Sequence, residues 1–341
     1  MEKRMSACTV PHNAGGEHNT SIPPLDEVII RNQTSQKVLS GDMLRAAVFN
    51  IERGFGLEPL LIYLKEHPLL KTADVILANE LDWGMKRTKN RNIAALIAEA
   101  TGLNYAYGIE FVALDGEKSG NKEALHGNAV FSRFPILKAG LLRLPRVFDW
   151  RESDQPRLGG RNAVFAVVEF AGRQIGLSSV HLENRTVPSG RLTQMECFLN
   201  GVNDFFADMP VILGGDMNTN CMNGADNAEA LMLAQNQNEQ RRRIKEVESI
   251  EPLLHYAQER GFDYKGCNLI DKTTRRKPIK GEKDLLLNLD WFFMRGFTAS
   301  NPQVVTTVFD EKALGPLSRY AEWQGTQISD HDAVVADFQL A

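Results

Sequence analysis

Short apolar runs rich in β-branched and aromatic residues recur along the chain from Leu44 to Leu340. They predict strands at residues 44–51, 73–80, 105–114, 127–134, 162–172, 173–182, 210–218, 287–294, 303–309 and 332–340. Amphipathic stretches between some of these runs predict helices at residues 58–67, 90–102 and 190–207. The chain therefore mixes strands with helices near both ends and carries strands in series in its middle.

The serial strands limit how the sheets can be built. Ala171 and Gly172 lie between two adjacent runs and fit a hairpin turn. Consecutive strands of this kind favour antiparallel pairing over a strictly alternating parallel sheet. We therefore expect two mixed sheets packed face to face with helices outside, a fold of the α+β type within the α/β class.

The polar motifs are spread over almost the whole ordered length, so dividing the chain would separate residues that belong together. Residues 1–40 are polar, with a brief apolar patch at 28–30, and we expect a largely disordered leader there. We expect one catalytic domain over residues 41–341. A polar, mostly helical insertion is predicted within it, near residues 222–262.

The charge balance bears on the class of substrate. The chain has 39 Lys and Arg against 43 Asp and Glu, a formal net charge of -4, so it has no overall positive field to attract a polyanion. Basic residues do cluster at 241–243 and at 275–277, where they could form a local groove. The alternative is that these clusters are a solvated helix face and a solvated loop.

The four cysteines (Cys8, Cys197, Cys221 and Cys267) form no CxxC pair, so we expect free thiols in a reducing compartment. The N-terminus has no apolar segment typical of a signal peptide. No apolar run reaches the roughly 18 residues needed to span a bilayer. We therefore expect a cytoplasmic protein without a transmembrane segment, and the sequence indicates no particular oligomeric state.

Polar residues end or interrupt several of the apolar runs. A strand end is rigid and opens onto a rim where a substrate can bind, so these positions are candidate site residues. They are Asn50, Glu52, Glu80, His181, Glu183, Asn184, Asp216, Asn218, Asp290, Asp330, His331 and Asp332. Taken singly, an Asn or Asp after a strand is more often a turn or cap residue.

Asp290 is harder to explain in this way, because it lies inside the apolar run LNLDWFFM. A carboxylate buried there without a partner would be costly. We expect an imidazole as that partner, and His331 is the candidate. Beside another candidate, Asp216, the preceding Gly214 and Gly215 allow a tight approach of the backbone.

Most of the candidate ligands offer oxygen. Only His181 and His331 offer nitrogen among them. Such a set suits Mg²⁺ or Mn²⁺ better than Zn²⁺. No P-loop, dinucleotide-binding fingerprint or HExxH helix in the sequence competes with this interpretation.

Seven of these segments occur in a recognisable order: FNIERG, LANE, HGNAVFSRFPI, VHLEN, GGDMN, LDWFF and SDHD. In this order the chain resembles the endonuclease/exonuclease/phosphatase superfamily over about residues 44–340. The GDMN and SDH elements are weak alone, whereas seven in order are a strong signal. The resemblance implies a four-layered α/β sandwich, two packed mixed β-sheets flanked by helices, that hydrolyses phosphoesters with Mg²⁺.

The resemblance also implies roles for the candidate residues. Asn50 and Glu80 resemble the metal-binding pair, with Glu80 the main ligand and Asp330 near the metal. Asp216 and Asn218 resemble residues that orient the attacking water and hold the phosphate. Asp290 and His331 resemble the paired Asp and His, and His181 a residue that stabilises the scissile phosphate or protonates the leaving group. Asn184 and Arg191 match the family motifs less well.

Two departures from the family pattern leave the substrate open. Glu52 stands where many relatives carry another residue, and the compact nucleases have no counterpart of the insertion at 225–261. The substrate could be a small phosphoester, a lipid headgroup or a nucleic acid. A catalytically inactive scaffold with the same fold is the alternative function, although no candidate residue is missing.

The segments at residues 115–124 and 142–160 are polar and contain glycine, and we expect them to border the site. Phe148, Trp150 and Arg151 in the second segment could stack on or clamp a substrate. Local packing is the alternative for the aromatic residues.

Overall fold

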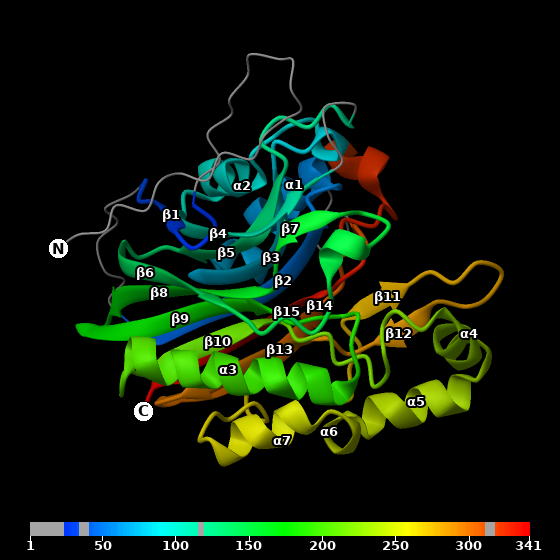
Figure 1. Ribbon diagram of the computed structural model, residues 1–341. Coiled ribbons are helices and arrows are strands. Elements are labelled where there is room, and N and C mark those ends of the chain that lie inside the picture. The colour runs from blue at the N-terminus through cyan, green and yellow to red at the C-terminus, as the bar shows by residue number, and fades with distance from the viewer. Residues whose placement is uncertain (1–23, 34–40, 115–118, 311–317) are drawn as a thin grey trace.

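The computed structural model describes residues 24–33, 41–114, 119–310 and 318–341, and it builds them into two large mixed sheets with helices on both outer sides (Figure 1). The eight-stranded sheet runs in the order β1 (Val28–Arg31), β4 (Asn104–Ala113), β5 (Leu125–Ser132), β3 (Val75–Trp83), β2 (Met43–Arg53), β15 (Ala333–Leu340) and β14 (Phe297–Val305), with β7 (Arg157–Gly159) beside β4. The five-stranded sheet runs β13 (Asp290–Arg295), β10 (Val211–Asp216), β9 (Arg173–His181), β8 (Asn162–Phe170) and β6 (Ile136–Arg143). A separate hairpin pairs β11 (Arg275–Lys277) with β12 (Leu285–Leu287).

The helices lie outside the two large sheets (Figure 1). They are α1 (Leu57–Glu66), α2 (Ile93–Thr101), α3 (Pro188–Phe206), α4 (Asn227–Gln235), α5 (Gln237–Lys245), α6 (Val247–Ile250) and α7 (Pro252–Glu259). Short 3₁₀ turns lie at Leu70–Thr72, Lys86–Thr88, Trp150–Glu152 and Ser318–Trp323. The expected four-layered α/β sandwich is confirmed, with α1 and α2 over the larger sheet and α3 and α7 over the smaller one (Figure 1).

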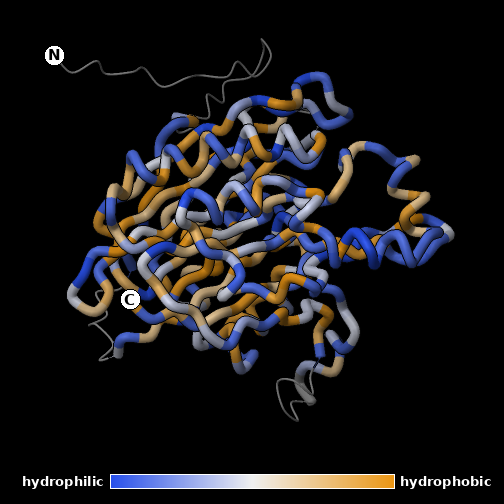
Figure 2. Tube along the Cα trace, turned by 90° about the horizontal axis from the view of Figure 1, so that it is seen from below, coloured by the Kyte–Doolittle hydropathy of each residue, from blue (hydrophilic) through white to orange (hydrophobic). Residues whose placement is uncertain are grey.

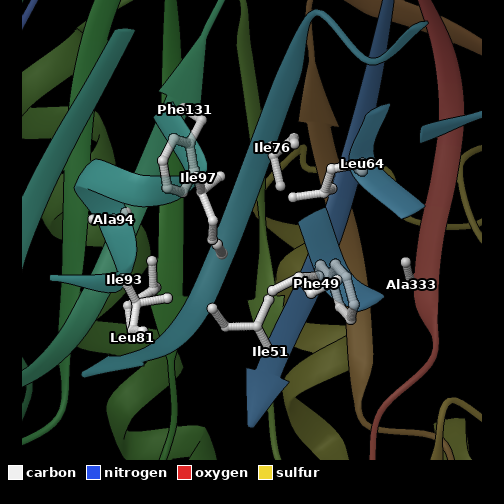
Figure 3. Close-up of a cluster of buried hydrophobic side chains, with 14 of the residues drawn as sticks. Phe49, Ile51, Leu64, Ile76, Leu81, Ile93, Ala94, Ile97, Phe131 and Ala333 are labelled. Atoms are coloured by element: carbon white, nitrogen blue, oxygen red, sulfur yellow. The ribbon is translucent and has the colours of Figure 1, made fainter. Parts of the chain in front are cut away.

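The apolar runs are continuous because both faces of these strands are buried. Successive side chains of a strand point to opposite faces of the sheet. In β2, Val48 therefore packs between the two sheets, together with Ile212 and Phe292 of the smaller sheet. Its neighbour Phe49 packs under α1, where Leu64 belongs to the same buried cluster (Figure 3). Hydrophobic segments accordingly gather in the interior and hydrophilic ones at the periphery (Figure 2).

The elements expected from the sequence are present. Each apolar run contains or overlaps a strand, and the three expected helices are α1, α2 and α3. The hairpin between β8 and β9 pairs Phe170 with Arg173, and both turn residues have positive φ, 49° at Ala171 and 75° at Gly172. Two positive φ values in a row are the signature of the tight turn that matches the twist of paired strands.

The predicted leader lies mostly outside the described residues, at 1–23 and 34–40. The part of it that is described includes β1, which pairs antiparallel with β4 at the edge of the larger sheet. In the described part of the chain no helix is long and apolar enough to cross a membrane. The three described cysteines are free thiols.

The segment predicted as a helical insertion is helical, as α4 to α7. Of these, α7 packs on α3 and contributes Leu253 and Leu254 to the outer core of the smaller sheet. A fully buried ion pair holds the segment in place: Arg191 of α3 donates to both carboxylate oxygens of Glu251, the N-cap of α7, at 3.0 and 2.5 Å. Arg191, a weak match to the family's site residues, therefore attaches this segment to the domain.

We expect Arg191→Met to lower the free energy of unfolding by about 3–5 kcal/mol, because it leaves the carboxylate of Glu251 buried without its charge partner. Urea unfolding checks this. The double variant Arg191→Met/Glu251→Gln should lose less than Arg191→Met alone, and Arg173→Met, at an exposed position of β9, serves as the control. A single variant within about 1 kcal/mol of the unaltered protein would show that the ion pair does not hold the segment.

Candidate active site

Strand direction brings the candidate residues of both sheets to one edge. β2 and β3 are parallel, so Asn50 and Glu80 both lie near the carboxyl ends of their strands. β15 is antiparallel to β2, so His331, just before β15, reaches the same edge. In the smaller sheet, the register pairs Asp216 of β10 with His181 of β9 on one side and with Asp290 of β13 on the other.

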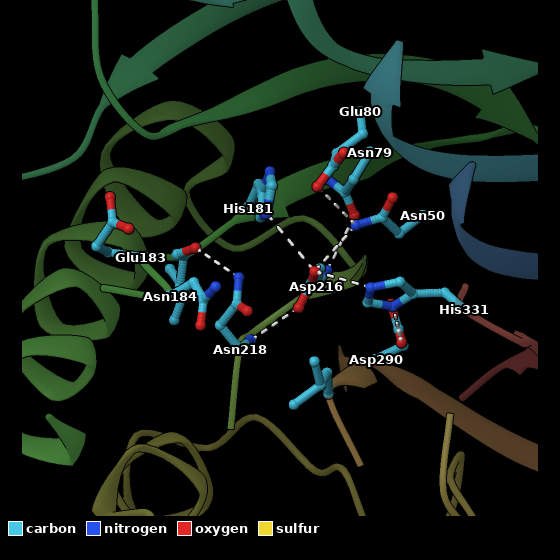
Figure 4. Close-up of polar contacts among 12 residues, drawn as sticks. Asn50, Asn79, Glu80, His181, Glu183, Asn184, Asp216, Asn218, Asp290 and His331 are labelled. Atoms are coloured by element: carbon cyan, nitrogen blue, oxygen red, sulfur yellow. Dashed lines mark hydrogen bonds and ion pairs between the residues drawn. The ribbon is translucent and has the colours of Figure 1, made fainter. Parts of the chain in front are cut away.

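Asp216 lies at the centre of this group, with a side chain that is almost completely buried (Figure 4). Its Oδ2 accepts a hydrogen bond from Asn50 Nδ2 at 3.0 Å, and its Oδ1 accepts one from the backbone N–H of Asn218 at 2.9 Å. The Nε2 atoms of His181 and His331 lie 3.6 and 3.7 Å from the same Oδ2. Donors from both sheets therefore converge on one carboxylate.

The expected contact between Asp290 and His331 is present. His331 Nδ1 lies 2.8 Å from Asp290 Oδ2, and both side chains are buried. Burial lowers the pKa of His331, but the carboxylates of Asp290, Asp216 and Asp330 more than offset this and raise it. With Nδ1 engaged by Asp290, the ring presents Nε2 toward Asp216.

Asn50 and Glu80 are adjacent, with Asn50 Nδ2 3.4 Å from Glu80 Oε1. Each lies at a shift in strand register, between Asn50 and Arg53 in β2 and between Ala78 and Leu81 in β3. Glu80 has φ of 59°, a conformation that a non-glycine residue adopts at a cost. Bulges of this kind commonly re-aim a side chain beside an active site.

The charges around Glu80 favour its ionised form. Burial raises the pKa of its carboxyl group, but the nearby Arg53, His126, His181 and His331 more than offset this. The pKa of Glu80 therefore lies well below its ordinary value. An ionised carboxylate is the form that binds a divalent cation.

Asn79, the residue before Glu80, links the two sheets and was not among the candidates. Its Oδ1 accepts from the backbone N–H of Asp216 at 2.9 Å, and its Nδ2 lies 3.1 Å from Val180 O and 3.2 Å from Ser179 Oγ. These bonds fix the ends of β9 and β10 against β3. Asn79 belongs to the LANE motif, but nothing in the sequence says which of its polar residues faces the other sheet.

Glu110 and Arg161 form a second buried group that sequence analysis missed. Glu110 Oε2 lies 3.2 Å from His181 Nδ1, and its Oε1 accepts from Arg161 Nη1 at 2.8 Å. Burial raises the pKa of Glu110, but the nearby His181 and Arg161 more than offset this and lower the pKa to about 2. The available signal was the one used for Asp290, since Glu110 interrupts the apolar run YAYGIEFVAL.

The remaining candidates hold the rim in place. Asn218 Nδ2 donates to the backbone oxygen of Leu182 at 2.9 Å, and Asn184 Oδ1 accepts from Asn220 at 3.1 Å. Glu183 accepts from the indole N–H of Trp150 at 2.7 Å and from Arg161 at 3.2 Å.

Asp330 lies at the edge of the group and is bound by Arg275 of β11, with Arg275 Nη2 2.7 Å from Asp330 Oδ2. Its Oδ1 lies 3.8 Å from His331 Nε2. Glu52 Oε2 accepts from the backbone N–H of Asp330 at 2.9 Å, so Glu52 holds the segment that carries His331.

The glycines before Asp216 allow the close approach expected of them. A Cβ at Gly215, where φ is 147°, would lie 1.9 Å from the backbone oxygen of Val180. One at Gly214 would lie 2.5 Å from a methyl group of Val48 in the facing sheet.

Four of the six basic residues in the two clusters, Arg242, Arg243, Arg275 and Arg276, form ion pairs with carboxylates. Arg242 and Arg243 of α5 bind acidic side chains of the same helical segment, with 2.7 Å from Arg242 Nη2 to Glu239. Arg275 and Arg276 bind Asp330 and Asp332. These ion pairs argue against a groove for a polyanion. The second cluster is not the solvated loop of the alternative interpretation either, because Arg275 and Arg276 lie half-buried in β11.

The loop before β7 borders the site, as expected. Trp150 packs against Phe111 and Phe148, with ring centroids 5.5 and 5.2 Å apart, which favours the packing interpretation of these rings. Arg151 is exposed and binds Asp149 at 2.7 Å. In the other segment expected near the site, residues 115–118 lie outside the described part of the chain.

Two sets of residues could hold a divalent cation. Asp216, Asp290 and His331 each offer a ligand atom within 4.8 Å of the others, and Asp290 Oδ1 is buried with no hydrogen-bond partner among the described residues. A cation there would compete with the bond between Asp290 and His331. The ionised Glu80 and the amide of Asn50 form the second set, and their oxygen donors match the preference of Mg²⁺.

Comparisons with known proteins identify the family and the fold. Residues 47–331 match the model of the endonuclease/exonuclease/phosphatase family. Among solved structures, a protein of that name from Beutenbergia cavernae is 17% identical with a TM-score of 0.56, over 88% of this chain and 72% of that one. The human Nocturnin catalytic domain with bound sulfate is 14% identical with a TM-score of 0.54, over 94% and 100%.

A family protein from Bacteroides thetaiotaomicron is 13% identical with a TM-score of 0.53, over 88% of this chain and 98% of that one. Identities this low show the fold alone. No curated protein matched the sequence. The family model covers most of the chain, and on that basis this protein belongs to the endonuclease/exonuclease/phosphatase family.

Proposed function

We propose that this protein hydrolyses a phosphoester by in-line attack of water, with a divalent cation, Mg²⁺ or Mn²⁺, bound at Glu80 and Asn50. The observation that carries the proposal is the position of Asp216. Its carboxylate is buried and faces the Nε2 atoms of two imidazoles. Asp216 is separate from Glu80 and Asn50, the proposed ligands of the cation. Members of the family are typically hydrolases of phosphoester bonds that use a divalent metal.

Asp216 would orient the attacking water. Its Oδ1 is already engaged by the backbone of Asn218, and the bond from Asn50 restrains its Oδ2. A carboxylate restrained in this way can accept a proton from water without first reorganising. The amide group of Asn218, held by the backbone of Leu182, would line the phosphate site next to it.

The two imidazoles would contact the phosphoryl group. His331, with Nδ1 engaged by Asp290, would donate from Nε2 to a phosphoryl oxygen. His181, restrained by Glu110 and Arg161, would stabilise the scissile phosphate or protonate the leaving group. Preorganised donors of this kind lower the barrier because they need no reorientation as negative charge develops.

A cation bound by Glu80 would neutralise charge on the phosphoryl group and on the leaving oxygen. Glu80 is the proposed main ligand and Asn50 the second. Asp330 would add negative charge nearby, although Arg275 already binds its carboxylate.

A small substrate is favoured over a polynucleotide. The net charge is -4, and Arg242 and Arg243 of α5 and both arginines of β11 bind acidic side chains of this chain. A protein that binds a phosphate backbone usually presents unpaired cations along a groove.

We expect Mg²⁺ or Mn²⁺ to support hydrolysis of at least one member of a panel that comprises an aryl phosphodiester, an aryl phosphomonoester, plasmid DNA and sphingomyelin. A chelator should abolish the activity, and added metal should restore it. The preferred substrate would give the substrate class. No hydrolysis and no metal binding would favour the inactive scaffold.

We expect Glu80→Gln to weaken Mn²⁺ binding at least about tenfold, because it removes the proposed anionic ligand. Asp290→Asn should change the affinity by less than about threefold, since Asp290 belongs to the other set of possible ligands. Isothermal titration calorimetry measures both. A larger loss of Mn²⁺ affinity in Asp290→Asn than in Glu80→Gln would indicate that the cation binds at Asp216, Asp290 and His331 instead.

A further inference from the structure

A cavity of about 640 Å³ lies beside the candidate active site, between β4, β5 and the segment that enters β7. Its lining includes Lys86, Arg87, Phe111, His126 and Arg157. Phe111 follows Glu110, which contacts His181, and His126 Nδ1 lies 2.9 Å from Asp82 Oδ1, two residues beyond Glu80. Residues of the cavity wall are thus connected to the site on two sides. None of the candidate site residues of the sequence lines it.

The wall of the cavity carries net positive charge. Arg87 is neutralised by Asp82, which accepts from two of its nitrogens at 2.7 Å each. Asp154, at the rim, binds Arg185 at 3.0 Å. Two further cations, Lys86 and Arg157, remain, and within the described part of the chain no carboxylate lies within ion-pair distance of either.

Arg157 is held in place by aromatic rings and an amide oxygen, none of which carries a negative charge. Its guanidinium lies over the rings of Trp150 and Phe111, 4.7 and 5.5 Å from their centroids, and Nη2 donates to Gln155 Oε1 at 2.7 Å. The Trp150 indole is fixed in turn by its bond to Glu183. Burial, with a smaller effect of Arg161, lowers the pKa of Arg157 to about 10. An anion would stabilise the charged form.

The size of the cavity indicates what kind of anion it can take. Pockets for small molecules commonly have volumes of roughly 300–1,000 Å³, so this one has room for a phosphate group and the group that carries it. Phe111, Met85 and Pro156 supply apolar wall for that carrier. Arginine and lysine together are typical ligands of phosphate.

We propose that this cavity, which we call the Arg157 pocket, binds a second phosphate group of the substrate, one that is not hydrolysed. That the molecule bound in this pocket is the substrate rests on the proposed function. It narrows the substrate class to a small molecule that carries two phosphate groups. One group lies at Asp216 and the other lies at Arg157 and Lys86.

Binding of inorganic phosphate to metal-free protein tests the pocket without turnover. Isothermal titration calorimetry in the presence of chelator would compare the unaltered protein with Arg157→Gln, Lys86→Met, Arg151→Gln and His331→Ala. We expect binding to weaken about tenfold in Arg157→Gln and to weaken in Lys86→Met, which lies at an exposed position and should not impair folding. Arg151→Gln, an exposed arginine of the same loop outside the cavity, should bind as the unaltered protein does.

The His331→Ala variant distinguishes phosphate bound in the Arg157 pocket from phosphate bound in the active site. We expect this variant to retain phosphate binding in the pocket. Loss of binding in His331→Ala with full binding in Arg157→Gln would overturn the proposal, as would no phosphate binding in the unaltered protein. The phosphate titration needs neither metal nor hydrolysis. Its result can therefore be interpreted even if the protein proves not to hydrolyse phosphoesters.

Discussion

The hydrogen bonds of Asn79 join the two sheets at the edge where the site lies. Its amide group reaches from β3 to the backbone of Asp216 and Val180 and to the hydroxyl of Ser179. A buried polar group left without partners typically costs about 1–3 kcal/mol, so these bonds strongly favour one alignment of the sheets. Sheet packing through Val48, Leu77 and Ile212 is apolar and by itself less specific about register. The position of Asp216 relative to Glu80 therefore depends on Asn79.

Around this junction, the backbone itself is in unusual conformations. Glu52, Arg53, Glu80 and Asn218 all have positive φ, between 47° and 65°. Non-glycine residues in this region cost free energy and cluster at functional sites, where the surrounding packing maintains them. In β2 and β3 they coincide with bulges that turn Glu52 and Glu80 toward the rim. The rigid sheets thus hold side chains that an ordinary strand would point elsewhere.

Much of this arrangement follows from sequence, and the reasons are local. The pairing of Asp290 with His331 could be predicted because a lone carboxylate in an apolar run needs a partner. Glu110 gave the same signal in β4 and was missed. Its partners are Arg161, the residue before β8, and His181 of β9, and only the folded sheets show that they meet. Strand ends could be read from periodicity, whereas the bulges depend on pairing between distant segments.

Other elements were missed because their sequences are short or mixed. The strand β6 is partly exposed along most of its length, and β11 and β12 each have three residues, so none of them gives a clear periodic pattern. The pairing of Arg275 with Asp330 joins residues 55 positions apart. It could not be inferred from charge patterns along the chain. For the same reason, Arg242, Arg243, Arg275 and Arg276 look like free cations in the sequence but are paired with carboxylates in the fold.

Asp216 is the residue on which the proposed chemistry depends most directly. Steady-state hydrolysis of bis(p-nitrophenyl) phosphate at saturating Mg²⁺ compares Asp216→Asn with Asp208→Asn, an exposed control in the turn before β10. We predict that Asp216→Asn lowers kcat at least about a thousandfold while the melting temperature stays near that of the unaltered protein, since the amide keeps the size of the side chain but cannot accept a proton from water. A folded Asp216→Asn variant with nearly unaltered kcat would contradict the account.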